Sequence, residues 1–159
     1  LISYRLKNEK LVSKISSKSL NMKKFEKYEF VIYENKLNGL KNFVIKKGKF
    51  NSNKSIRVRV VSSNLKNSKL ILKDKKIIKS LKHLSNFSNF ALIVINNQKI
   101  DKIENENVTL RYYGIGAQII KDLKVKNMIL VTRTKKNIIG LEGFGLKIKK
   151  QEIIKWKKY

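Results

Sequence analysis

The sequence has no cysteine, and its 159 residues include a single histidine. Without cysteine the chain cannot form disulfides, bind zinc through thiolates or use a thiol nucleophile. The histidine, His83, lies in the segment IIKSLKHLSNF, whose apolar spacing predicts a helix. We therefore expect His83 to be a partly exposed helix residue rather than a catalytic group.

Membrane and export signals are also missing. No apolar run reaches about 18 residues, the length that a membrane-spanning helix needs, and no signal peptide opens the chain. The chain starts at Leu1 instead of methionine, so we expect it to be a piece of a longer protein. Together with the lack of cysteine, these absences fit a reducing cytoplasm, which is the location we predict.

Acidic residues are scarce, with 11 against 38 basic residues, and the net charge is +27. Charge of this size attracts polyanions such as RNA, DNA or anionic lipid. However, only five of the basic residues are arginine, which leaves 33 lysines, and readers of nucleic acid rely on arginine for bidentate contacts. Because lysine, asparagine and isoleucine are enriched together, we favour compositional drift of a solvated surface over a selected polyanion site.

The length and the 42% apolar content predict one packed domain. Strands are expected over 27–35 and 41–48, joined at the hairpin signal Asn38-Gly39, and over 55–63, where arginines alternate with apolar residues. The second half of 68–87 and residues 114–125 have helical patterns, and 97–108 is polar and predicts a loop. The run NFALIVINN is typical of a strand buried on both faces.

The order of these elements predicts an α/β fold, β-rich in the first half and α/β in the second, with parallel strand pairing. The strand NMILVT follows the second helix, and the glycine-rich segment KNIIGLEGFGLKI leads to a last strand. Residues 1–16 predict a linker or a short lead-in helix from a preceding domain, with Leu1, Ile2, Leu6 and Leu11 on one stripe. The main domain is then expected over 17–159.

Residues 111–146, RYYGIGAQIIKDLKVKNMILVTRTKKNIIGLEGFGL, resemble the C-terminal half of GTP cyclohydrolase II without a gap. The segment VRVVSSNL is similar to that family's VRVHSECL. The segment LISYRLKNEKLV resembles the joint before the cyclohydrolase half in proteins fused to a dihydroxybutanone-phosphate synthase, an enzyme of riboflavin biosynthesis. The resemblance implies a GTP cyclohydrolase II-like domain, an upstream magnesium-dependent synthase domain in the same chain, and a homodimer.

Departures from the family pattern concern its chemistry. The family holds a catalytic zinc with three cysteines, of which the first falls on Asn64 here and the other two, in a CDCG motif, have no counterpart. A neutral amide is a poor zinc ligand beside thiolates. The family's RQEGRGIG loop, which engages the nucleotide, has no match in this chain. The family also has an acidic residue, a proposed proton acceptor, two positions before its conserved arginine, and this position is Thr109 here. The resemblance therefore implies a domain without zinc that is inactive.

A few family positions survive. Arg111 matches an arginine proposed to attack the triphosphate, and Thr132 matches a nucleotide-binding threonine. A lysine of the following loop falls on Asn137, with Lys136 beside it, so Thr132 and Lys136 are vestigial nucleotide-binding candidates that leave residual GTP binding open. A surface role explains Arg111 equally well, and a turn role at the strand end explains Thr132 slightly better than nucleotide binding does. Turns and close helix–sheet approach explain the glycines of the segment without chemistry: Gly114, Gly116, Gly140, Gly143 and Gly145.

Three functions remain open at this point. The first is a scaffold or regulatory partner for the synthase, touching it through the Leu1 stripe and the tail that holds Trp156 and Tyr159. The second is a cyclohydrolase that still works by another route. The third is a lysine-rich module for nucleic acid, in which interleaved aromatics stack on bases: Tyr28, Phe30, Tyr33 and Phe43. Aromatics at strand spacing more commonly belong to a core.

Overall fold

The structure is a computed structural model, and it describes residues 9–22, 25–50, 54–65, 68–96, 106–133 and 145–154. Seven strands form one mixed sheet: β1 (Val12–Met22), β2 (Phe25–Asn35), β3 (Lys41–Lys47), β4 (Ile56–Ser63), β5 (Phe90–Asn96), β6 (Asn127–Thr132) and β7 (Lys147–Ile153). Their order across the sheet is β1-β2-β3-β5-β4-β6-β7. The β1–β2–β3 and β3–β5 pairs are antiparallel, and β5–β4–β6–β7 are parallel. This mixed sheet agrees with the coarse expectation of a β-rich chain with α/β character.

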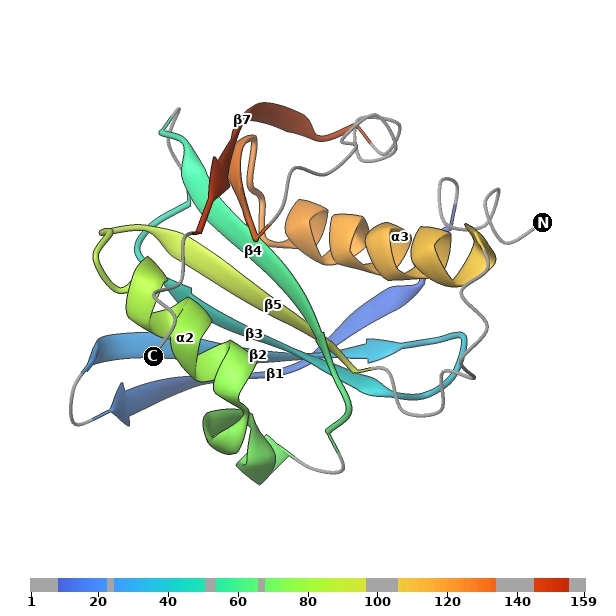
Figure 1. The fold of residues 1–159 in the computed structure, drawn as a ribbon. Helices are drawn as coiled ribbons and strands as arrows, with labels where there is room; N and C mark the ends of the chain where they lie inside the picture. Colours follow the sequence, from blue (N-terminus) through green and yellow to red (C-terminus); the bar gives the residue numbers. More distant parts are fainter. Residues whose placement is uncertain are drawn as a thin grey trace.

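Two helices cover opposite faces of this sheet (Figure 1). α3 (Glu106–Asp122) packs on one face, and α2 (Lys75–Leu84), preceded by the 3₁₀ helix η1 (Ser68–Lys73), packs on the other. All residues of β5 are buried, as expected for a strand covered on both sides. Its side chains alternate between the two cores, with Ala91, Ile93 and Ile95 toward α3 and Phe90, Leu92 and Val94 toward α2.

Local chemistry accounts for α2 and the β2–β3 hairpin. Asp74 caps α2 by accepting hydrogen bonds from the backbone nitrogens of Lys76 (2.8 Å) and Ile77 (3.3 Å). The apolar stripe of the helix, Ile77, Leu81 and Leu84, is buried. In the hairpin turn Gly39 has φ +71°, a conformation that favours glycine, so the Asn38-Gly39 prediction is confirmed.

The lead-in segment differs from expectation. Residues 12–16 belong to β1, where Val12 pairs with Asn35 and Ser13 with Glu34, so a helix through this stretch was wrong. Leu11 is 2% exposed and packs in the core beside α3, instead of facing a preceding domain. Pairing with β2 and burial of Leu11 outweigh the weak helical spacing. The expected boundary between 16 and 17 falls inside β1, while Leu1, Ile2 and Leu6 lie outside the described residues.

The second helix begins earlier than its glycines indicate. α3 starts at Glu106, inside the segment predicted as a loop, so Gly114 and Gly116 lie within the helix and do not form a turn before it. A Cβ at Gly116 would stand 3.5 Å from Val60 Cγ1, an ordinary contact, so close packing does not demand glycine there. Gly145, with φ +79°, does occupy a turn as expected. Gly140 and Gly143 lie outside the described part of the chain.

The aromatics proposed for base stacking are mostly core residues. Tyr28, Tyr33 and Phe43 are between 0% and 3% exposed, and Phe30 stacks on Phe43 with ring centroids 5.7 Å apart. Buried rings cannot stack on bases, so this element of the nucleic-acid hypothesis was wrong. None of the helices in the described ranges is long and apolar enough to cross a membrane.

Candidate functional site at the strand ends

The parallel strands bring polar residues together at their carboxyl ends. Ser63 closes β4, Asn96 closes β5 and Thr132 closes β6, and all three are less than 10% exposed. Ser63 and Asn96 are direct partners in the β4–β5 register. Ligands of open α/β sheets bind outside the carboxyl ends of parallel strands, so this edge is the candidate functional site.

Asn96 fixes the chain that leaves β4. Its Nδ2 donates to the Leu65 carbonyl oxygen (3.0 Å), and its Oδ1 accepts from the Leu65 backbone nitrogen (3.4 Å). The Asn96 backbone nitrogen donates to Asn42 Oδ1 (2.8 Å). Asn42 is 1% exposed, and its Nδ2 has no hydrogen-bond partner within the described structure. A buried donor without a hydrogen-bond partner lowers the stability of the folded protein, and this one lies beside the candidate site.

Asn64 lies between two fixed neighbours. On one side the Ser63 hydroxyl donates a short hydrogen bond to Asp74 Oδ2, which links the end of β4 to the cap of α2. On the other side Leu65 is held by Asn96. The Asn64 side chain itself is exposed. The position is therefore well defined, and it presents a neutral amide to solvent.

Thr132 is bound into the sheet. Its hydroxyl lies 3.5 Å from Gln151 Oε1 of β7, and its carbonyl oxygen accepts from the Ile154 backbone nitrogen (2.8 Å). These contacts join the ends of the neighbouring strands β6 and β7. Thr132 therefore has a structural task that requires no ligand.

A second polar cluster joins α2 to β4 and β7. His83 Nε2 lies 3.0 Å from Glu152 Oε1, Arg57 Nη2 lies 3.3 Å from Glu152 Oε2, and the guanidinium of Arg57 stacks 3.6 Å from the ring centre of Phe87. Partial burial acts to raise the pKa of Glu152, but the hydrogen bonds and charges of His83 and Arg57 outweigh it, so the pKa lies below its usual value. The His83 side chain is 26% exposed on its helix, as expected. Sequence spacing gave no signal for this cluster because Glu152 is distant in the chain.

Comparisons with known proteins identify the family to which this chain belongs. The family model for GTP cyclohydrolase II matches residues 79–153. The riboflavin biosynthesis protein RibBA of Aquifex aeolicus is 31% identical, with 98% of this chain and 45% of that protein covered. A 3,4-dihydroxy-2-butanone 4-phosphate synthase of Photobacterium phosphoreum is 27% identical, with 93% of this chain and 45% of that protein covered. The chain belongs to the GTP cyclohydrolase II family.

A solved structure shares the fold. RibBX from A. baumannii, a two-domain 3,4-dihydroxy-2-butanone 4-phosphate synthase, superposes with a TM-score of 0.67 at 22% identity. The match covers 96% of this chain and 44% of that one. The chain thus spans less than half the length of each of these relatives.

The residues present do not fit the zinc of the GTP cyclohydrolase II pattern. Asn64 stands at the first cysteine position, and the sequence has no cysteine to complete a site. Among the residues that the structure describes, no three His, Asp or Glu side chains gather as possible metal ligands. Since an exposed amide cannot replace thiolate ligands, no step of a reaction is assigned to a metal here.

The remaining GTP cyclohydrolase II positions are only partly visible. Arg111 and Thr109 lie in the first half of α3, and their side chains fall outside the described structure. Lys136 and Asn137 follow β6 and are also outside it. Whether Arg111, Thr132 and Lys136 meet around a nucleotide therefore stays a prediction.

Proposed function

We propose that this chain is a GTP cyclohydrolase II-like domain that has lost hydrolysis and acts as a scaffold or regulatory partner of a 3,4-dihydroxy-2-butanone 4-phosphate synthase domain in riboflavin biosynthesis. One observation carries the loss of hydrolysis, namely the exposed Asn64 at the metal-ligand position of a chain without cysteine. Without a metal, the site lacks the Lewis acid that would lower the pKa of the attacking water and polarise the carbon under attack.

The relatives support the partner role. The Photobacterium phosphoreum protein is named for synthase activity alone, although this chain aligns with 45% of it. The Aquifex aeolicus relative carries the broader name of a riboflavin biosynthesis protein. As predicted from the sequence and its resemblance, we also expect a cytoplasmic homodimer in which the synthase domain retains its activity.

The packing of the first described residues also supports it. Gln118 of α3 accepts a hydrogen bond from the Leu11 backbone nitrogen (2.6 Å) and donates one to the Glu9 carbonyl oxygen (2.9 Å). Asp122 of the same helix pairs with Lys10 (3.4 Å) and accepts from the Tyr33 hydroxyl (2.7 Å). A preceding domain would therefore be joined through a segment that is firmly held against α3, as a scaffold role requires.

Metal and turnover measurements test the loss of hydrolysis. We expect purified protein to hold far less than one zinc per chain by elemental analysis, and to release no formate from GTP. The control is Arg111→Ala, because turnover in the parent that this variant abolishes would establish an active cyclohydrolase. Either tightly held zinc or such turnover would contradict the proposal.

A further inference from the structure

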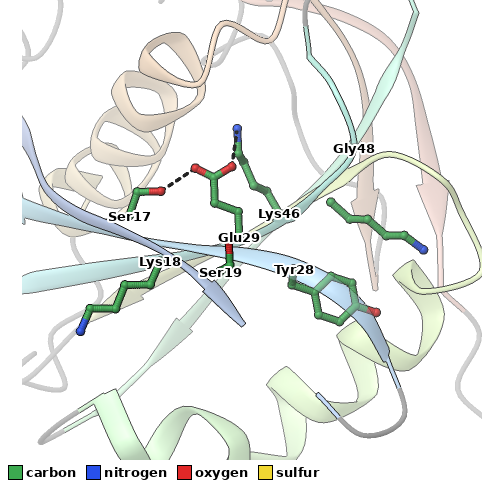
Figure 2. Close-up of a pocket in the computed structure, with 8 residues that line it drawn as sticks. Ser17, Lys18, Ser19, Tyr28, Glu29, Lys46 and Gly48 are labelled. Atoms are coloured by element: carbon green, nitrogen blue, oxygen red, sulfur yellow. Dashed lines mark hydrogen bonds and ion pairs between the residues drawn. The ribbon is translucent and has the colours of Figure 1, made fainter. Parts of the chain in front are cut away.

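The polar side chains on β1, β2 and β3 are occupied with one another (Figure 2). The Glu29 carboxylate accepts a hydrogen bond from the Ser17 hydroxyl (2.6 Å) and pairs with Lys46 Nζ (3.4 Å). Tyr28, drawn beside them, belongs to the core under α2, because successive residues of a strand point to opposite faces of the sheet. A further chemistry is carried instead by the turn that joins β2 to β3.

This turn holds an exposed asparagine followed by glycine. Asn38 and Gly39 form the one Asn-Gly dipeptide of the sequence, and both residues are exposed. Nothing lies within 4 Å of the position that a Cβ of Gly39 would take. A backbone nitrogen that follows asparagine attacks the side-chain amide most readily when the next residue is glycine, since glycine has no side chain to shield that nitrogen.

We propose that Asn38 is a deamidation site whose reaction is controlled by opening of the β2–β3 turn. The Gly39 nitrogen loses its proton and forms a bond to Asn38 Cγ, while the bond between Cγ and Nδ2 breaks and Nδ2 leaves with that proton as ammonia. The succinimide ring that results takes up one water and opens at either carbonyl, to aspartate or to isoaspartate. The net reaction consumes one water and releases one ammonia, so it needs no other reactant.

The closed turn holds the reacting groups apart. The Gly39 nitrogen donates to the Asn35 carbonyl oxygen (2.8 Å), and Asn38 Oδ1 accepts from the Leu40 backbone nitrogen (2.9 Å). The Leu37 backbone nitrogen donates to Asn35 Oδ1 (2.9 Å), which holds the turn closed from its other side. Attack requires the Gly39 nitrogen to leave Asn35 and turn toward Cγ. The reaction therefore proceeds only in the fraction of time that the turn is locally open.

The two products have different effects on the fold. Aspartate at position 38 keeps an oxygen that accepts from the Leu40 nitrogen, whereas isoaspartate adds an atom to the main chain of a turn that sets the register of two strands. The same turn is tied to the start of β1, because the Lys36 nitrogen donates to the Leu11 carbonyl oxygen (2.9 Å). Isoaspartate should therefore loosen both the hairpin and the segment that leads into β1.

The experiment incubates the 159-residue chain in mildly alkaline buffer, with and without urea, and follows conversion by peptide mass mapping. We expect Asn38 to convert at least about tenfold faster in urea than in the folded chain, because unfolding removes the protecting hydrogen bonds. Asn35→Ala removes the acceptor of the Leu37 nitrogen and should speed conversion in the folded chain at least about threefold. The urea measurement uses the parent chain, so it does not depend on how well this variant folds.

Asn86 is the matched control. It is exposed like Asn38, but it is followed by Phe87, whose side chain shields the backbone nitrogen. In urea, where the fold has no influence, we expect Asn86 to convert at least about tenfold more slowly than Asn38.

Three outcomes decide the proposal. An isoaspartate product that lowers the melting temperature more than Asn38→Asp does would support the role given to the turn. Equal rates for Asn38 and Asn86 in urea would overturn the site. A rate at Asn38 that neither urea nor Asn35→Ala changes would overturn its control by turn opening.

Discussion

The single residue with the widest structural influence at the candidate site is Asn96. Its side chain bonds both backbone groups of Leu65, and its own backbone nitrogen bonds Asn42. The buried amide side chain thus pairs with the backbone of Leu65 as a neighbouring strand would. It determines where the chain goes after β4, and therefore where Asn64 is presented.

Replacement of Asn96 tests this. We expect Asn96→Ala to lower the free energy of unfolding by about 1–3 kcal/mol, because buried backbone groups lose hydrogen bonds. Asn86→Ala is the control, since Asn86 caps the exposed end of α2 through the His83 carbonyl oxygen at 3.2 Å, and we expect it to cost less than about 0.5 kcal/mol. Urea denaturation measures both, and equal losses would contradict the assigned role.

Glu152 predicts a pH dependence. Its pKa in the folded protein lies below the ordinary 4.5, so its contribution to stability is present above about pH 4.5 and is lost as the pH falls through the folded value. We expect the stability difference between the parent and Glu152→Gln to narrow as the pH is lowered from about 5 to about 3. Thermal melts across this range measure it, and a difference that stays constant would refute the pairing.

The sequence pattern predicts which face of a strand a side chain points to better than it predicts how deeply that side chain is buried. Alternation along β4 correctly put the arginines on the face opposite Ile56 and Val58. It gave no sign that Arg59 is only 6% exposed, with Nε bonded to Ser80 Oγ at 2.7 Å beneath α2. Burial depends on which helix packs above the strand, and that partner lies 21 positions away in the chain.

At the scale of elements, three glycines have different requirements. Gly39 has φ +71° with open space around it, and Gly48 has φ +89° with the Ser88 carbonyl oxygen and Asn89 in the way of a Cβ. Gly116 lies inside α3 with only an ordinary contact to Val60. An alanine would therefore meet backbone strain alone at Gly39, strain together with a steric clash at Gly48, and neither at Gly116.

Alanine substitutions should rank accordingly. We expect Gly39→Ala to cost about 1–2 kcal/mol from the left-handed backbone, and Gly48→Ala to cost more, since a clash adds about 1–3 kcal/mol. Gly116→Ala should be neutral or stabilising by up to about 1 kcal/mol, because alanine favours a helix. Chemical denaturation of the three variants gives the order, and a strongly destabilising Gly116→Ala would show that a packing constraint has been missed.

The elements that could be predicted are those with local signals. The β2–β3 hairpin has its Asn-Gly turn, β5 its apolar run and α2 its apolar helical spacing. The start of α3 was missed because glycines normally interrupt helices, whereas here the buried stripe of Ile115, Ile119 and Ile120 compensates. β1 was missed because its partner β2 decides its conformation.

At the scale of the whole molecule, the scaffold proposal predicts the effect of removal. In the longer protein that we expect to carry this chain, truncation before Leu1 should reduce dimerisation or the melting temperature while intrinsic synthase turnover is kept. Light scattering, thermal melts and synthase assays measure the three properties. A truncated synthase that is as dimeric and as stable as the parent would disprove the scaffold role.

A milder variant complements the truncation. Gln118→Ala removes the two hydrogen bonds that hold Glu9 and Leu11 against α3. We expect it to weaken the coupling between the two domains, seen as two separate thermal transitions where the parent shows one. Asn86→Ala, which removes hydrogen bonds at the end of α2 instead, is the control and should leave a single transition.

The candidate site could be predicted only where the presence or absence of a residue type decides the chemistry. Missing cysteines argue against the zinc from sequence alone. The bonds that fix Asn64 were not predictable, because they join Ser63 to Asp74 and Leu65 to Asn96 across separate elements.

The order of the strands has a consequence for the chain during its synthesis. All pairings among β1, β2, β3, β4 and β5 involve residues made by position 96, whereas α3, which covers Val44 and Ile93, ends at Asp122. At about 5–20 residues per second, the apolar face that α3 covers stays bare for roughly one to five seconds on the ribosome. Slow codons between 97 and 122 would prolong this exposure to chaperones and aggregation, so the yield of folded protein should depend on translation speed across that segment.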